Sequence, residues 1–292
     1  MQKTKSMVYP SLGITRILNK ILDGFLRIRA NEILNSGTAI VLKENPAQTL
    51  GKLAKELTAE GVDSTGKYVN YAKLAGSDIY KRFKHFTLGL PNCKPEDLGD
   101  RQQQIAFWIN LYNALIVDAV IHYKIKGSLF SKPSLFRRAA YNVAGFRFSA
   151  DDIENGVLRG NLPSPSFPIR PFGNSDPRCV TVIQRMDPRI HFALVCAAKS
   201  CPPIATYSAD RLEQQLELAA SSFINGGGVR FADNAVWISK IFKWYQADFG
   251  GLSGVRAIIS KYSKDEKVRQ ALRSPNLKFN YSPYDWTINR VA

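Results

Sequence analysis

The sequence predicts an α+β protein, with one helix-rich domain and a small, mostly antiparallel sheet. Long segments carry apolar residues at helical spacing, above all the segment that begins at Asp100. Short apolar runs at 229–231 and 235–239, on either side of Asp233 and Asn234, predict a hairpin of two strands. Because no repeat, low-complexity run or clear linker divides the 292 residues, we expect one domain with a helical N-terminal extension.

The composition suits a protein with a sizeable core, since 45% of the residues are hydrophobic. A formal charge of +16 and a pI near 9.7 favour anionic partners in general. The basic residues are dispersed, however, with short clusters only at 81–84 and 137–138, and neither zinc-finger spacing nor an aromatic RNA-binding signature is present. Specific nucleic-acid binding is therefore not expected.

The four cysteines, Cys93, Cys179, Cys196 and Cys201, are too few for a disulfide scaffold and form no C-x-x-C pairs of the kind that hold structural zinc. No apolar run reaches the roughly 18 residues of a membrane span. The N-terminus also lacks the pattern of a signal peptide. We therefore expect reduced thiols, no transmembrane span, and a soluble, intracellular protein.

Residues 12–34 combine apolar positions at helical spacing with arginines and lysines between them. Two interpretations remain open. Such a basic amphipathic helix can pack on its own domain, or it can make peripheral contact with an acidic membrane. A second helix is predicted from Gln48 to Glu60, where Gly61 ends it.

The helix from Asp100 has a wide apolar stripe and is the predicted centre of the core. Asn110 and Asn113 lie three positions apart and so on one side of it. Buried amides need hydrogen-bond partners, so these two either tie down a neighbouring loop or orient a catalytic group.

Further elements are predicted on both sides of a loop at 161–177. Phe146 to Ser149 is a strand, followed by a helix that Ser149 and Asp152 cap and that carries Glu154. Beyond the loop, Ser208 caps a helix that the glycines at 226–228 end. Three shorter helices are predicted at 240–249, 255–262 and 265–274, and an extended segment at 278–289.

The chain is organised around the stretch that begins at Asp187. Ile190 to Cys196 is a short apolar run after a proline, which predicts a buried strand. Alternation along a strand would turn Cys196 away from His191. Cys201 follows a flexible loop and precedes two prolines that stiffen the chain, so we expect Cys201, rather than Cys196, to meet His191.

Five motifs resemble those of the domain-of-unknown-function 547 family. In chain order they are IAFWINLYNAL (105–115), DDIENGVLRG (151–160), DPRIHFALVCAAKSCPP (187–203), SKIFKWYQADFG (239–250) and YDWTIN (284–289). The resemblance implies a family region at 66–292, with its core motifs at 100–250, after a helical extension at 1–65. Some members have been labelled glutaredoxin-like, and a distant similarity to rearranged papain-like folds is also expected. The family often has Asn and Gly where this chain has Val195 and Ala197.

These residues favour a thiol-dependent hydrolase or acyltransferase acting on an amide or acyl bond. Cys201 would be the nucleophile and His191 its base, and the third group that holds the ring would be Asp187, Asn110, Asn113 or Asp285. Glu154 is a further candidate, because polar residues recur across the five motifs. The alternative is that His191 and Cys201 only pack in the core.

Other functions need different features of the same chain. A zinc site at His191, Cys196 and Cys201 is opposed by the opposite strand faces, so no metal is expected, and no cofactor either. A redox pair of Cys196 and Cys201 has four intervening residues rather than the two of thioredoxin-type motifs. A non-enzymatic interaction module would use the basic N-terminal helix. The sequence does not identify a substrate.

Overall fold

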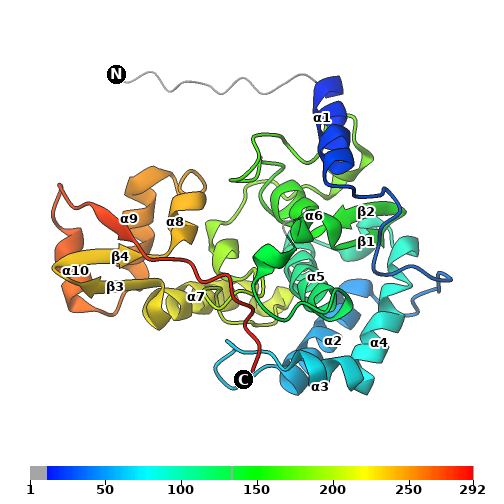
Figure 1. Cartoon of the computed structure of the whole chain (residues 1–292), viewed down its shortest axis with the longest axis horizontal. Coiled ribbons are helices and arrows are strands. Elements are labelled where there is room, and N and C mark those ends of the chain that lie inside the picture. The colour runs from blue at the N-terminus through cyan, green and yellow to red at the C-terminus, as the bar shows by residue number, and fades with distance from the viewer. Residues whose placement is uncertain (1–11, 133, 292) are drawn as a thin grey trace.

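A computed structural model describes residues 12–132 and 134–291 (Figure 1). The described helices are α1 (Leu12–Phe25), α2 (Pro46–Gly61), α3 (Tyr71–Gly76), α4 (Asp78–Thr87), α5 (Arg101–His122), α6 (Leu135–Arg138), α7 (Leu212–Phe223), α8 (Lys240–Trp244), α9 (Gly251–Tyr262) and α10 (Glu266–Leu272). The strands are β1 (Ala140–Val143), β2 (Phe146–Ser149), β3 (Val229–Ala232), β4 (Ala235–Ile238) and β5 (Phe279–Tyr281). The predicted α+β class is confirmed.

The strands form two small sheets. Strands β1 and β2 make an antiparallel pair, while β3, β4 and β5 make a sheet in which β3 and β4 are antiparallel and β5 joins β4 in parallel. The predicted hairpin at 229–239 is confirmed. Its turn residues Asp233 and Asn234 have φ angles of 52° and 55°, the left-handed conformation that a tight two-residue hairpin turn requires.

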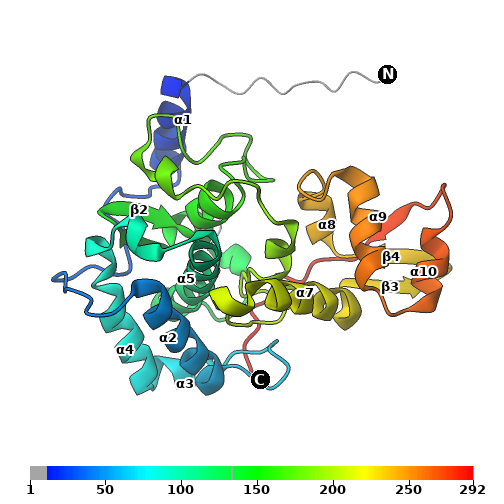
Figure 2. The same ribbon diagram turned by 180° about the vertical axis from the view of Figure 1, so that it is seen from behind.

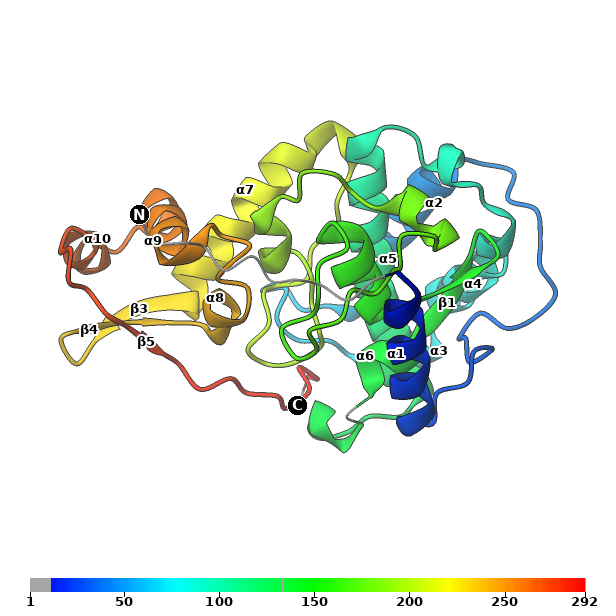
Figure 3. The same cartoon turned by 90° about the horizontal axis from the view of Figure 1, so that it is seen from above.

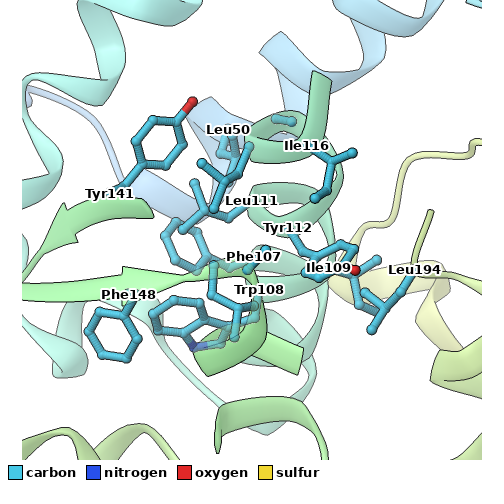
Figure 4. Packing of buried hydrophobic residues seen from close by; sticks show 14 of the residues in the cluster. Leu50, Phe107, Trp108, Ile109, Leu111, Tyr112, Ile116, Tyr141, Phe148 and Leu194 are labelled. Atoms are coloured by element: carbon cyan, nitrogen blue, oxygen red, sulfur yellow. The ribbon is translucent and has the colours of Figure 1, made fainter. Parts of the chain in front are cut away.

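Helix α5 is the centre of the larger core, as predicted. Asp100 caps it in a capping box with Gln103, which satisfies two backbone donors that the helix start leaves free. Trp108 on α5 is fully buried and lies with its ring centre 5.0 Å from that of Phe148 on β2 (Figure 4). By length and composition alone α5 could cross a membrane, but 83% of its apolar window is buried inside the protein.

A second, smaller core lies at the other end of the molecule. Its buried side chains come from α7 to α10 and from β3 and β4. Figures 1 and 2 show these elements as a separate lobe, with α7 running between the lobes and the C-terminal segment crossing back towards α5. Phe192 belongs to the smaller core, whereas Ile190 and Ala193 belong to the larger one. The stretch that begins at Asp187 therefore lies between the two cores.

The predicted strand at 190–196 is wrong. Residues Pro188–Phe192 form a 3₁₀ helix, because the Asp187 side chain caps the Arg189 backbone N–H at 2.9 Å and Pro188 takes the first helical position. The residues that follow do not pair with a strand. Instead the Asn113 side chain on α5 donates to the Ala193 carbonyl at 3.0 Å and accepts from the Val195 N–H at 2.9 Å.

Helix α1 is shorter than the predicted segment at 12–34. It ends at Phe25, and Arg27 has a φ angle of 53°, which does not continue a right-handed helix. One side of α1 contacts the body, since Arg137 of α6 pairs with Asp23 at 2.7 Å. Figure 3 shows α1 beside α6.

The other side of α1 exposes a row of apolar side chains, with Ile17 at 56%, Ile21 at 63% and Phe25 at 83% exposure. Contact of this helix with an acidic membrane stays a prediction. Leu50, Leu53 and Leu57 of α2 share the larger core with α5, and the domain division after residue 65 also stays a prediction.

Candidate functional site

Polar residues from the first, second and fourth motifs meet at the carboxylate of Glu154. The Tyr112 hydroxyl of α5 lies 3.1 Å from one Glu154 oxygen, and the Tyr245 hydroxyl makes a short hydrogen bond to the other. Glu154 is placed by a π-helical turn (Asp152–Leu158) that follows β2. The predicted cap of that turn is confirmed, because Ser149 and Asp152 exchange side-chain to backbone hydrogen bonds of 2.9 and 3.0 Å.

His191 lies beside this carboxylate and pairs with a different one. Its Nε2 is 2.8 Å from Asp248 Oδ2, and its ring stacks on Tyr245 with centroids 3.9 Å apart. Arg159 donates two hydrogen bonds to the same Asp248 carboxylate, at 2.6 and 2.9 Å. The Arg159 and Asp248 side chains are only 6% and 2% exposed, so this ion pair is buried.

Burial and hydrogen bonds determine which side chains of this group are ionised. Burial lowers the pKa of His191 although the Asp248 hydrogen bond opposes the shift, so the ring is neutral near pH 7 and its Nε2–H donates to Asp248. Burial works to raise the pKa of Asp248, but hydrogen bonds from His191 and Arg159 outweigh it and lower that pKa. An ionised, bidentate Arg159–Asp248 pair and a neutral His191 form a cluster with its hydrogen bonds satisfied. We name Glu154, Arg159, His191, Tyr245 and Asp248 the histidine cluster.

The two cysteines of the third motif lie together on another side of the same stretch. The sulfur atoms of Cys196 and Cys201 are 2.7 Å apart, and the Cys196 backbone N–H donates to the Cys201 sulfur at 3.1 Å. The Tyr284 hydroxyl, from the fifth motif, is 3.3 Å from the Cys201 sulfur and 3.5 Å from that of Cys196. We name Cys196, Cys201 and Tyr284 the thiol cluster.

The surroundings of the two thiols shift their pKa values in opposite directions. Burial works to raise the pKa of Cys201, but hydrogen bonds from Cys196, from Tyr284 and from backbone N–H groups outweigh it and lower that pKa. The hydrogen bond to Cys201, followed by burial, raises the pKa of Cys196 well above its usual value. Cys201 is therefore the thiol that ionises first, with Cys196 as its proton-bearing neighbour.

The backbone between the cysteines turns back on itself. Ala197 has a φ angle of 69°, a left-handed conformation that an L-residue with a Cβ adopts at a cost. The Cys201 N–H donates to the Ala198 carbonyl at 3.0 Å. Two further hydrogen bonds join the turn to the C-terminal segment: the Lys199 N–H donates to the Thr287 carbonyl at 2.8 Å, and the Asn289 N–H donates to the Ala197 carbonyl at 2.9 Å. This turn brings Cys201 to Cys196. The family often has Gly at the Ala197 position, and a positive φ explains that preference.

Cys201 lines a pocket of about 310 Å³ at the junction of the lobes, and Cys196 does not. The other lining residues are Lys67, Lys199, Ser200, Pro203, Ser222, Phe223, Gly226, Gly227, Gly228, Arg230, Ser239, Ser282, Pro283 and Tyr284. The thiol with the lowered pKa is thus the one that a ligand in the pocket would reach.

The remaining candidate residues have local structural contacts. Asn110 exchanges hydrogen bonds of 2.7 and 3.0 Å with the backbone of Tyr207, and Asn113 holds Ala193 and Val195 as described above. Asp187 caps the 3₁₀ helix and pairs with Arg189 at 2.5 Å. Asp285 is exposed, and its backbone N–H donates to the Ser200 hydroxyl at 2.8 Å.

The proposed pairing of His191 with Cys201 is not observed as a hydrogen bond. Within the residues that the structure describes, Nε2 of His191 bonds with Asp248, while the Cys201 sulfur bonds with Cys196 and Tyr284. The expectation that Cys196 faces away from His191 rested on a strand that does not form.

The expected absence of zinc rested on the same strand. The described residues contain no group of three or more His, Cys, Asp and Glu side chains placed to hold a metal ion.

Sequence reasoning did not select three residues that the structure brings to these clusters: Tyr245, Asp248 and Tyr284. The spacing of Tyr245 and Asp248 was a usable signal, because residues three positions apart lie on the same side of a helical turn. Nothing local to Tyr284 predicts its contact with Cys201, which lies 83 positions away along the chain.

The fold and these clusters define an α+β protein with two adjoining polar sites between its cores. Residues 95–224 match the model of the family described as "Protein of unknown function, DUF547", so the resemblance seen in the motifs is confirmed over these residues. The fourth and fifth motifs lie outside the matched residues. Neither the curated proteins nor the solved structures gave a match, and the similarity to rearranged papain-like folds stays a prediction.

Proposed function

We propose that this protein is a thiol–disulfide oxidoreductase that uses Cys201 and Cys196 as its dithiol. The observation that carries the proposal is the 2.7 Å separation of the two sulfur atoms beside a pocket. Of the two cysteines, Cys201 lines this pocket and Cys196 does not. Two free thiols at that distance need little movement to form a disulfide. The lowered pKa of Cys201 makes it the attacking thiolate.

The reaction would take two exchange steps. The Cys201 thiolate attacks one sulfur of a substrate disulfide, a new S–S bond forms between Cys201 and that sulfur, and the other substrate sulfur leaves as a thiolate that takes up a proton. Cys196 then loses its proton and attacks the Cys201 sulfur, which releases the second substrate thiol. The substrate gains two electrons and two protons, and the protein holds a Cys196–Cys201 disulfide. An external dithiol reductant restores the starting state by the reverse exchange.

The neighbours of Cys201 fit this chemistry. The Cys196 N–H and the Tyr284 hydroxyl both lie where they can donate to a Cys201 thiolate, at 3.1 and 3.3 Å. Acyl or amide hydrolysis would instead need a general acid–base group beside the sulfur, to protonate the leaving group and then to activate the attacking water. His191 makes no described hydrogen bond to that sulfur, and its Nε2 is held by Asp248. The contacts therefore support thiol–disulfide exchange rather than acyl transfer.

Trapping of the first intermediate tests the proposal. Cys196→Ser removes the resolving thiol, so incubation with a disulfide-bonded peptide should accumulate a peptide–Cys201 mixed disulfide, seen by mass spectrometry and reversed by dithiothreitol. Cys201→Ser should form no adduct, and the matched control Cys179→Ser should behave as the wild type. Circular dichroism and thermal melting would show that each variant is folded. A folded Cys196→Ser protein that forms no adduct at Cys201, or forms it at Cys179, would overturn the proposal.

A further inference from the structure

We infer that the substrate is an acidic polypeptide segment that carries a disulfide and lies along a continuous basic tract across two pockets. The inference rests on the proposed function, because it names the class of substrate for the same thiols. The tract consists of Lys67, Lys126, Lys199, Arg230 and Arg290. It is defined by the residues that line the pockets and by the exposure of these side chains.

The first pocket, beside Cys201, is lined by three cationic residues and by no Asp or Glu. Lys67, Lys199 and Arg230 are all exposed at its wall. The guanidinium of Arg230 lies 5.1 Å above the Trp237 ring, which orients it without neutralising it. The Lys67 ammonium donates to the Gly226 carbonyl at 3.2 Å, and it forms no ion pair within the part of the chain that the structure describes. A carboxylate beside the attacked disulfide would meet these cations.

A second pocket, of about 520 Å³, continues the tract from the same lysine. It is lined by Tyr68, Lys126, Lys199, Thr287, Ile288, Arg290 and Val291, again with no Asp or Glu. Lys199 belongs to both pockets, so the two open beside one another. A small anion would fill only one of them, whereas an extended chain can place carboxylates in both.

Two acidic side chains lie beside the tract, outside its lining. Asp63 accepts hydrogen bonds from the backbone N–H groups of Lys67 and Tyr68 at 2.9 and 3.0 Å, and the one from Tyr68 contributes most to lowering its pKa. Hydrogen bonds to Thr287 lower the pKa of Asp285, with a smaller contribution from the charge of Lys199. The five cations of the tract exceed these two negative charges. The chain as a whole carries a formal charge of +16, which adds a long-range attraction for acidic partners that salt weakens.

The chemistry of Cys201 selects polypeptide among the polyanions that such a tract attracts. Nucleic acids and anionic lipids offer phosphates but no disulfide to attack. An exposed charge pair contributes little by itself, so a single carboxylate would add little selectivity, whereas several along one segment would add up. An acidic segment beside a disulfide meets both requirements.

Two synthetic peptides separate these contributions. Both have the same single intramolecular disulfide, but one has Asp and Glu on either side of it and the other has Asn and Gln at those positions. The reduced full-length protein should react with the acidic peptide faster by a factor on the order of 10 at low salt, and the ratio should shrink at high salt. Lys199→Gln and Arg290→Gln should each reduce the ratio, because they remove a charge from the tract. Lys55→Gln, an exposed lysine on α2, is the charge-matched control and should leave the ratio unchanged.

The outcomes distinguish this inference from the proposed function. Equal rates for the two peptides would overturn the acidic substrate while leaving the dithiol chemistry intact. A ratio that responds to Lys199→Gln and not to Arg290→Gln would overturn the extended binding mode. If neither peptide oxidises Cys196 and Cys201, the proposed function itself fails.

Discussion

One short stretch of chain supplies His191 to the histidine cluster and both cysteines to the thiol cluster, yet the two clusters differ in whether a reactive group is left accessible. Arg159 and Asp248 form a buried ion pair, and the neutral His191 ring donates a hydrogen bond to Asp248. Cys201 lines an open pocket and has a lowered pKa. Polar residues inside apolar motifs can therefore stabilise a fold or carry out chemistry. Access to a pocket and an unused reactive group distinguish the second case from the first.

The largest effect is expected from breaking the histidine cluster. Asp248→Ala leaves the Arg159 charge buried without its partner and removes the acceptor for His191. Removing one member of a buried pair costs about 3–5 kcal/mol. Urea denaturation followed by circular dichroism should show a loss of this size. Asp210→Ala, at an exposed carboxylate, is the control and should change the free energy of unfolding little. A normally stable Asp248→Ala protein would mean that the cluster is not structural.

A smaller, pH-dependent effect is expected beside Glu154. Burial, followed by the charge of Asp152, raises the pKa of Asp151 from 3.8 to about 7. Since the folded state holds this proton more tightly than the unfolded state, stability falls as the pH rises from about 4 to 7.

Asp151→Asn removes that cost. A rise of about three pKa units corresponds to about 4 kcal/mol, and the 19% solvent exposure of the Asp151 side chain reduces it, so the variant should be more stable by about 2 kcal/mol at pH 8 and by much less at pH 4. Urea denaturation of both proteins at the two pH values checks the difference. A gain that is larger at pH 4 would contradict the assigned sign.

The thiol cluster should respond in reactivity rather than in stability. Burial raises the pKa of the Tyr284 hydroxyl well above its usual value, so it stays protonated and can donate to a Cys201 thiolate. Tyr284→Phe should raise the pKa of Cys201 by about one unit, which corresponds to about 1.4 kcal/mol. The pH profile of iodoacetamide labelling at Cys201 measures this shift. Tyr281→Phe is the control and should leave the profile unchanged. An unchanged profile in Tyr284→Phe would show that the Tyr284 hydroxyl does not stabilise the Cys201 thiolate.

The smallest effect is expected in the turn between the cysteines. Ala197→Gly relieves the cost of a φ angle of 69° and should stabilise the protein by about 0.5–1 kcal/mol. Ala198→Gly, at a buried neighbour outside the left-handed region, should destabilise it. Thermal unfolding of the two variants tests the contrast. Destabilisation by both would show that the conformation of Ala197 costs nothing.

The sequence could predict elements whose signals are local. The start of α5 follows from Asp100 and Gln103, and the hairpin at 229–239 follows from its turn residues Asp233 and Asn234. The apolar run at 190–196 misled the prediction because it is buried on both sides by two cores, so its composition carries no period. The Asp187–Pro188 pair signalled a helical start there, which the apolar composition outweighed.

The site could be predicted only in part, because its contacts join distant segments. The third motif drew attention to His191 and Cys201, which stay candidate site residues, but their partners in the structure come from elsewhere. Asp248 reaches His191 across 57 positions, and Tyr284 reaches Cys201 across 83. No periodicity specifies such contacts. The face on which Cys196 lies depended on a local conformation that caps and tertiary packing decided.

The most direct test of the account is a redox titration of the full-length protein. The protein is equilibrated in buffers of increasing oxidised to reduced dithiothreitol, free thiols are blocked by alkylation, and peptides are mapped by mass spectrometry. The account predicts one reversible two-electron transition in which Cys196 and Cys201 become linked to each other while Cys93 and Cys179 remain alkylated. If Cys196 and Cys201 stay free across the titration, or if Cys201 pairs instead with Cys179, the dithiol function is contradicted.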